Sequence, residues 1–152
     1  MTINVRTKGQ EGEREVAKIM NAIVAKVRTE KSLPALATED EHFQRNQNQS
    51  AVGGSDLSCP YPLEIEIKRQ EALSINTWWN QTVASAARTK GIPILMFRQN
   101  RKKWRIMMLG EVPLLPNNSS KYLALPECRV EIDLDTFVRW FTEFCKQYSE
   151  NG

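Results

Sequence analysis

The segment "LEIEIKRQ" (residues 63–70) alternates apolar and charged side chains with the period of a β-strand. Three apolar side chains share one face of this strand and three charged side chains share the other: Leu63, Ile65 and Ile67 against Glu64, Glu66 and Lys68. The apolar face predicts contact with a core. The row of charges then lies either on a solvated surface or in a functional site.

The composition is that of an ordinary globular protein. The 152 residues are 41% hydrophobic and 26% charged, which predicts a single domain over residues 1–152. The N-terminus lacks an apolar segment, and no run approaches the roughly 18 apolar residues of a membrane span. The three cysteines are widely spaced and form no CxxC pair, which favours reduced thiols and a cytoplasmic location.

Hydrophobic periodicity predicts the order α, β, β, β, α, β, β, α, and therefore an α/β domain with one mixed sheet flanked by helices. Residues 8–27 predict an amphipathic helix, with Glu13 on its buried stripe, an unusual place for a carboxylate. Further strands are expected near residues 43–48, through Asp56, and over 92–99 and 103–109. Helices are expected from Ser74 to Gly91 and over about 133–148, with a loop over 110–122. Trp78 and Trp79 are adjacent, so only one is expected to face the core.

The acidic residues of the charged strand have a spacing that suits metal chemistry. Asp56 is followed by nine residues and then by Glu66-x-Lys68, so a hairpin would bring the three side chains together. Two neighbouring carboxylates repel unless a cation joins them, and hard oxygen ligands favour Mg²⁺. A lysine on the same face could orient the attacking water and offset charge on a phosphate. Glu13 could supply a further ligand from the helix.

Basic residues are concentrated in "RQNRKKWR" (residues 98–105), which holds five cations and no acid, although the net charge is only +3. A cationic hairpin tip of this kind indicates a polyanionic partner. The residues expected to contact DNA phosphates are Arg98, Arg101, Lys102, Lys103 and Arg105, together with Lys8 and Arg69.

These motifs resemble a known family. "GGSD" (residues 53–56) with "EIEIK" (64–68) resembles the PD-(D/E)XK nuclease motif, with Ser55 in place of the proline. "KGQEGERE" (8–15) and "GIPILMFRQNRKKWRIMML" (91–109) are similar to segments of archaeal-type Holliday junction resolvases and their phage relatives. The resemblance covers a core of about residues 8–110 and implies a restriction-endonuclease-like fold. The insert over 29–42 and the tail after Gly110 depart from the archaeal pattern.

The resemblance also implies an activity. Glu13, Asp56, Glu66 and Lys68 fall on the catalytic positions, the three carboxylates being the metal ligands. Further DNA contacts implied by the family are Arg14, Arg45, Ser50 and Gln70. The expected protein is a homodimeric endonuclease that uses Mg²⁺, or Mn²⁺ in its place, to cut four-way DNA junctions, with no organic cofactor and no membrane association. Its expected location is the cytoplasm of a prokaryote or of a phage-infected host.

Three alternatives stay open at this point. A nuclease of the same fold could act on other branched DNA or on duplex DNA. A DNA-binding protein could keep the fold without catalysis. A structural domain could carry the charged strand on a solvated face, since Glu-x-Lys on an alternating strand also arises by chance.

Overall fold

A computed structural model describes residues 5–46, 56–113, 122–123 and 128–148. The central sheet has the strand order β3-β4-β5-β8. Its strands are β3 (Leu63–Arg69), β4 (Ile92–Arg98), β5 (Arg105–Leu109) and β8 (Arg129–Asp133). Strand β3 runs parallel to β4, and the other two pairs are antiparallel. The sheet is therefore mixed, as predicted.

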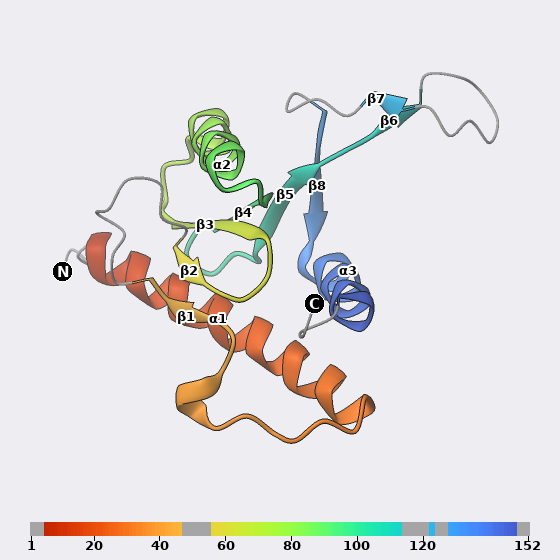
Figure 1. The fold of residues 1–152 in the computed structure, drawn as a ribbon. Coiled ribbons are helices and arrows are strands. Elements are labelled where there is room, and N and C mark those ends of the chain that lie inside the picture. Colours follow the sequence, from red (N-terminus) through yellow and green to blue (C-terminus); the bar gives the residue numbers. More distant parts are fainter. Residues whose placement is uncertain (1–4, 47–55, 114–121, 124–127, 149–152) are drawn as a thin grey trace.

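Helices cover both faces of this sheet (Figure 1). Helix α2 (Ile75–Thr89) lies on one face, and α1 (Val5–Glu30) and α3 (Leu134–Gln147) lie on the other. Helix α2 forms the crossover between the parallel strands β3 and β4, a connection that antiparallel neighbours do not need. The result is the three-layered α/β arrangement of a restriction-endonuclease-like domain.

Each face of the sheet has its own core. The alternation in β3 sends Leu63, Ile65 and Ile67 toward α1 and α3, where they join Val16, Met20, Phe137 and Phe141. Leu95 and Phe97 of β4 point the other way, toward α2, as the period of two requires. The apolar stripe of α3 lies against the sheet as the sequence predicts, and Asp133 caps this helix by accepting a hydrogen bond from the Thr136 N–H.

Small elements complete the fold. The 3-10 helix η1 (Thr38–Asp40) precedes the antiparallel pair β1 (Gln44–Arg45) and β2 (Leu57–Ser58). The pair β6 (Val112–Pro113) and β7 (Tyr122–Leu123) projects away from the helices (Figure 1). None of the helices in the described ranges has both the length and the apolar character needed to cross a bilayer.

Several sequence expectations were wrong in detail. The region 110–122 was expected to be a loop, but it contributes to the β6–β7 pair, and strand β8 was not anticipated. Trp78 and Trp79 are both buried, at 5% and 2% exposure, in the core beneath α2. Adjacent helix positions differ by only about 100° in direction, so one broad buried face holds both rings. The left-handed residue that ends α2 is Lys90, with φ of 58°, and not Gly91.

Candidate active site

Asp56 lies against the free edge of β3, the edge strand of the central sheet. The Asp56 N–H donates to the Ile65 carbonyl over 2.9 Å, and the Asp56 carboxylate Oδ2 accepts from the Ile67 N–H over 2.7 Å. Asp56 thus precedes β2 and does not pair through a regular hairpin with β3, which corrects the geometry expected from the sequence. The two hydrogen bonds nevertheless place its carboxylate beside the strand that carries Glu66 and Lys68.

Glu66 and Lys68 belong to the face of β3 that α2 covers. Glu64 on this face is buried, and its Oε2 accepts from the Thr89 hydroxyl of α2 over 2.9 Å. Glu66 and Lys68 are half-buried. The row of charges therefore lies in a covered site and not on a fully solvated surface.

The carboxyl groups of Asp56 and Glu66 are in direct contact. Burial, the charge of Asp56 and a hydrogen bond to Asp56 raise the pKa of Glu66 to about 8. Burial also raises the pKa of Asp56, as does the charge of Glu13, whereas the Ile67 N–H and the charge of Lys68 oppose the rise. With no cation between them, these carboxyl groups share a proton, as expected for like charges held close together.

Glu13 approaches the same site from α1. Its side chain is buried, and its Oε2 accepts from Arg45 Nε over 2.9 Å. The preceding Gly12 allows the helix to lie close to β3, because a Cβ there would be only 3.3 Å from the Cβ of Arg69. Glu13 is therefore near enough to act electrostatically on Asp56. Within the described ranges, however, no group of three or more His, Cys, Asp or Glu side chains is arranged to hold a metal ion.

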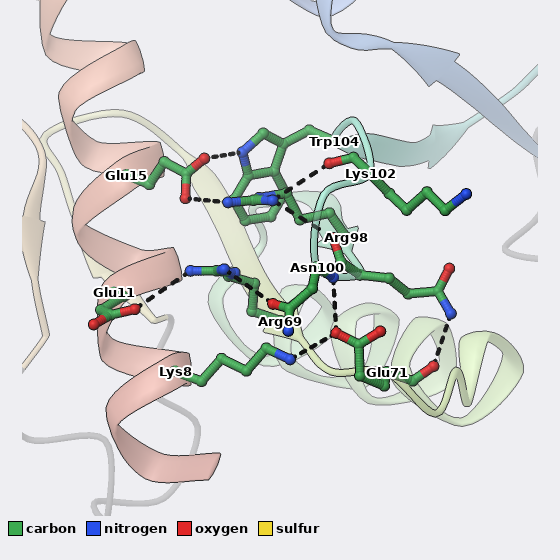
Figure 2. A network of polar contacts seen from close by, with 10 residues as sticks. Lys8, Glu11, Glu15, Arg69, Glu71, Arg98, Asn100, Lys102 and Trp104 are labelled. Atoms are coloured by element: carbon green, nitrogen blue, oxygen red, sulfur yellow. Dashed lines mark hydrogen bonds and ion pairs between the residues drawn. The ribbon is translucent and has the colours of Figure 1, made fainter. Parts of the chain in front are cut away.

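Three of the cations expected to bind DNA form ion pairs with acidic residues in a polar network around the ends of β3 and β4 (Figure 2). Lys8 Nζ lies 2.8 Å from Glu71 Oε1, which also accepts from the Asn100 N–H. Arg69 pairs with Glu11 over 3.5 Å and donates to Asn100 Oδ1. These contacts join α1, the segment after β3 and the β4–β5 turn.

Arg98 belongs to the same network (Figure 2). Its Nη2 lies 3.0 Å from Glu15 Oε2, and its guanidinium lies over the Trp104 ring, 5.4 Å from the centroid. Trp104 Nε1 donates to the other oxygen of Glu15 over 2.9 Å. Glu15 and Trp104 thus hold Arg98 against α1. This role of Arg98 was not predicted from the sequence, although Glu11 and Glu15 stand one helical turn apart on α1.

The other expected DNA contacts differ in exposure. Arg105 makes two hydrogen bonds to the Glu131 carboxylate and lies over the Phe97 ring. Four cations are exposed: Arg14 on α1, and Arg101, Lys102 and Lys103 in the β4–β5 turn. Gln70 is half-buried after β3, and Ser50 lies outside the described residues. The exposed set is the part of the predicted DNA surface that is open to a ligand.

Comparison with known families gives one match. The family described as "Phage putative PDDEXK endonuclease" matches residues 4–151, nearly the whole chain. The chain belongs to this family. It is thereby a nuclease of the PD-(D/E)XK superfamily, as the resemblance of "GGSD" and "EIEIK" indicated, and its phage affiliation is supported as well. Searches of curated proteins and of solved structures gave no match.

The shared proton predicts an unusual pH dependence of stability for this PD-(D/E)XK protein without metal. In the unfolded chain Glu66 titrates near its ordinary pKa of 4.5, whereas in the fold its pKa is about 8. Between these values the folded state holds a proton that the unfolded state has lost, so the free energy of unfolding falls as pH rises. Urea unfolding in EDTA at several pH values from 5 to 9 should therefore show a shallower decline for Glu66→Gln than for wild type. Parallel profiles would contradict the raised pKa.

The contacts in Figure 2 predict that Arg98 stabilises the fold, whereas Lys102 contributes to DNA binding. Replacing Arg98 by Met removes its hydrogen bond to Glu15 and should lower the free energy of unfolding by about 1–3 kcal/mol. Lys102→Met, in the exposed turn, should change it by less than about 0.5 kcal/mol and should weaken DNA binding instead. Chemical denaturation and fluorescence anisotropy with labelled DNA measure the two effects. Equal destabilisation by the two variants would contradict this assignment.

Proposed function

We propose that this PD-(D/E)XK protein is a divalent-metal-dependent endonuclease that hydrolyses DNA phosphodiester bonds at the edge of β3. Asp56 and Glu66 hold Mg²⁺, for which Mn²⁺ can substitute, while Glu13 assists and Lys68 positions the nucleophile. The observation that carries the proposal is the direct contact of the Asp56 and Glu66 carboxyl groups beside Lys68. Membership of a nuclease family supports it.

The donor set suits a hard divalent cation. Two carboxyl groups in contact leave one of them protonated in the absence of metal, and a dication between them would allow both to ionise. Mg²⁺ is commonly bound through one or two carboxylates, with water and substrate phosphate completing the octahedron. A pair of carboxylates is therefore sufficient, and Glu13 need not be a direct ligand. When bound, the cation supplies Lewis acidity and lowers the pKa of a coordinated water.

The residues around the pair have separate tasks. The charge of Lys68 lowers the pKa of both Asp56 and Glu66, which supports a role for its ammonium group beside the pair. From that position it can donate a hydrogen bond to the attacking water and offset the negative charge that develops on the phosphate. Glu13, fixed by Arg45, orients the site from α1. Helix α2 covers the face of β3 that carries Glu64, Glu66 and Lys68.

The proposed substrate is a four-way DNA junction cut by a homodimer. A junction presents two symmetry-related strands, and a twofold dimer supplies two sites in the matching arrangement. The support for this choice is the resemblance of residues 8–15 and 91–109 to junction resolvases. Other branched DNA and linear duplex are the competing substrates, and a non-catalytic DNA-binding protein is the competing function.

Cleavage assays test this proposal. Purified protein with Mg²⁺ should cut a labelled four-way junction faster than a linear duplex of identical sequence. Asp56→Asn and Lys68→Met preserve side-chain size but remove a ligand or a charge, so each should lower the cleavage rate by at least about 100-fold. Asp40→Asn changes an exposed acid in η1 and is the matched control, with a rate expected to equal that of wild type.

The outcomes separate the competing functions. Equal cleavage of junction and duplex would contradict junction selectivity, but the proposed nuclease site would still stand. Full activity of Asp56→Asn would contradict the site itself. Binding of every branched DNA without cleavage, in Mg²⁺ and in Mn²⁺, would favour the non-catalytic alternative.

A further inference from the structure

A groove of about 570 Å³ runs along α1 on the side that faces η1 and β1. Arg14 and Lys18 of α1 form part of one wall, and Glu41 and Arg45 form part of the other. The groove thus carries three cations and one acid. It lies outside the core and was not predicted from the sequence.

The two cations on α1 are available to a ligand. Arg14 and Lys18 are both exposed, and neither forms an ion pair with another residue in the described ranges. They are four residues apart, which puts their Cβ atoms about 5–6 Å from each other on one side of the helix. Exposed cations that line a concave surface and lack acidic partners form a favourable binding surface for a polyanion.

Two further polar side chains of the groove, Asn21 and Gln44, bond to backbone groups and shape its walls. The Asn21 amide donates to the Phe43 carbonyl, and its oxygen accepts from the Phe43 N–H, each over 2.9 Å. Gln44 Nε2 donates to the carbonyls of Glu39 and Glu41. The bonds of Asn21 fasten the segment before β1 to α1, and the bonds of Gln44 brace that segment internally.

The groove is continuous with the candidate active site. Arg45 lines the groove and also donates to Glu13, and Arg14 is the next residue after Glu13. Strand β1 pairs Arg45 with Leu57, the residue that follows Asp56. A chain that enters the site at Asp56 and Glu66 could therefore extend along α1 without leaving the protein surface.

We propose that this groove binds the sugar-phosphate backbone of the DNA substrate beyond the scissile phosphate, with Arg14 and Lys18 on neighbouring phosphates. This inference rests on the proposed nuclease function and extends it to the path of the DNA. The charge of the groove and its continuity with the site favour nucleic acid as the ligand. Ala22, exposed in the groove four residues after Lys18, leaves room for the backbone to lie against the helix. Because phosphate contacts carry no sequence information, the groove fixes the position of the DNA and not the choice of bases.

Salt-dependent binding tests the contribution of Lys18. A fluorescein-labelled four-way junction is titrated with protein in EDTA, which keeps the DNA uncut, at several KCl concentrations. Lys18→Ala should weaken binding about tenfold at 0.1 M salt and reduce the slope of log K against log[salt] by about one. Lys26→Ala, an exposed lysine on α1 outside the groove, is the control and should match wild type in both quantities.

A pair of variants at Ala22 separates charge from shape in the same titration. Glu and Gln have nearly the same size and helix propensity, so Ala22→Glu should bind the junction several-fold more weakly than Ala22→Gln. Unchanged affinity and slope for Lys18→Ala, together with equal binding by the two Ala22 variants, would overturn the groove proposal. If wild type cleaves DNA in that case, the nuclease function stands alone. Failure of wild type to cleave, with the expected salt slopes, would refute the nuclease function and keep the groove as a DNA-binding surface.

Discussion

The two hydrogen bonds between Asp56 and the backbone of β3 determine the geometry of the site. A strand at the edge of a sheet presents unpaired N–H and carbonyl groups that need partners. The Asp56 N–H donates a hydrogen bond to the Ile65 carbonyl, and the Asp56 carboxylate accepts one from the Ile67 N–H. The same contacts that complete the edge also place a carboxyl group beside Glu66, so the architecture of the fold and the position of the acid have one cause.

This arrangement concentrates like charges where the fold has little solvent to screen them. The carboxyl groups of Asp56 and Glu66 are in contact, the charge of Glu13 on α1 acts on Asp56, and Glu64 is buried on the same strand as Glu66. Such clusters oppose folding, which is why strongly perturbed carboxyl groups mark functional sites more often than structural ones. Lys68 and Arg45 offset part of the repulsion. A bound dication would offset the rest. The like charges would then destabilise the fold less with the metal bound than without it.

Sequence patterns predicted the features that depend on local periodicity. The alternation over 63–70, the β4–β5 hairpin and the apolar stripe of α3 follow from periods of two and 3.6 residues. The spacing and the motif resemblance both predicted that Asp56 lies beside Glu66, but the regular hairpin expected from the spacing is replaced by two hydrogen bonds between Asp56 and the edge of β3. Strand β8 was missed since only Ile132 and Val130 are apolar, and Val130 is 44% exposed.

The distribution of positive charge could not be read from the sequence. Whether Arg98 faces DNA or Glu15 depends on how α1 crosses the end of β4, and that crossing is set by core residues such as Val16 and Met20. Lys18 lines the groove because the segment around Phe43 packs against α1. The surroundings of Arg98 and the position of Lys18 both depend on tertiary packing, which composition and local sequence pattern do not predict.

The most direct measurement is Mn²⁺ binding to the purified protein without DNA, followed by calorimetry or by electron paramagnetic resonance. If Asp56 and Glu66 form one divalent site, wild type binds Mn²⁺ and each of Asp56→Asn and Glu66→Gln weakens binding by at least about tenfold. Glu143→Gln, an exposed change on α3, leaves binding unchanged. Equal binding by all four proteins, or no binding by wild type, would contradict the account.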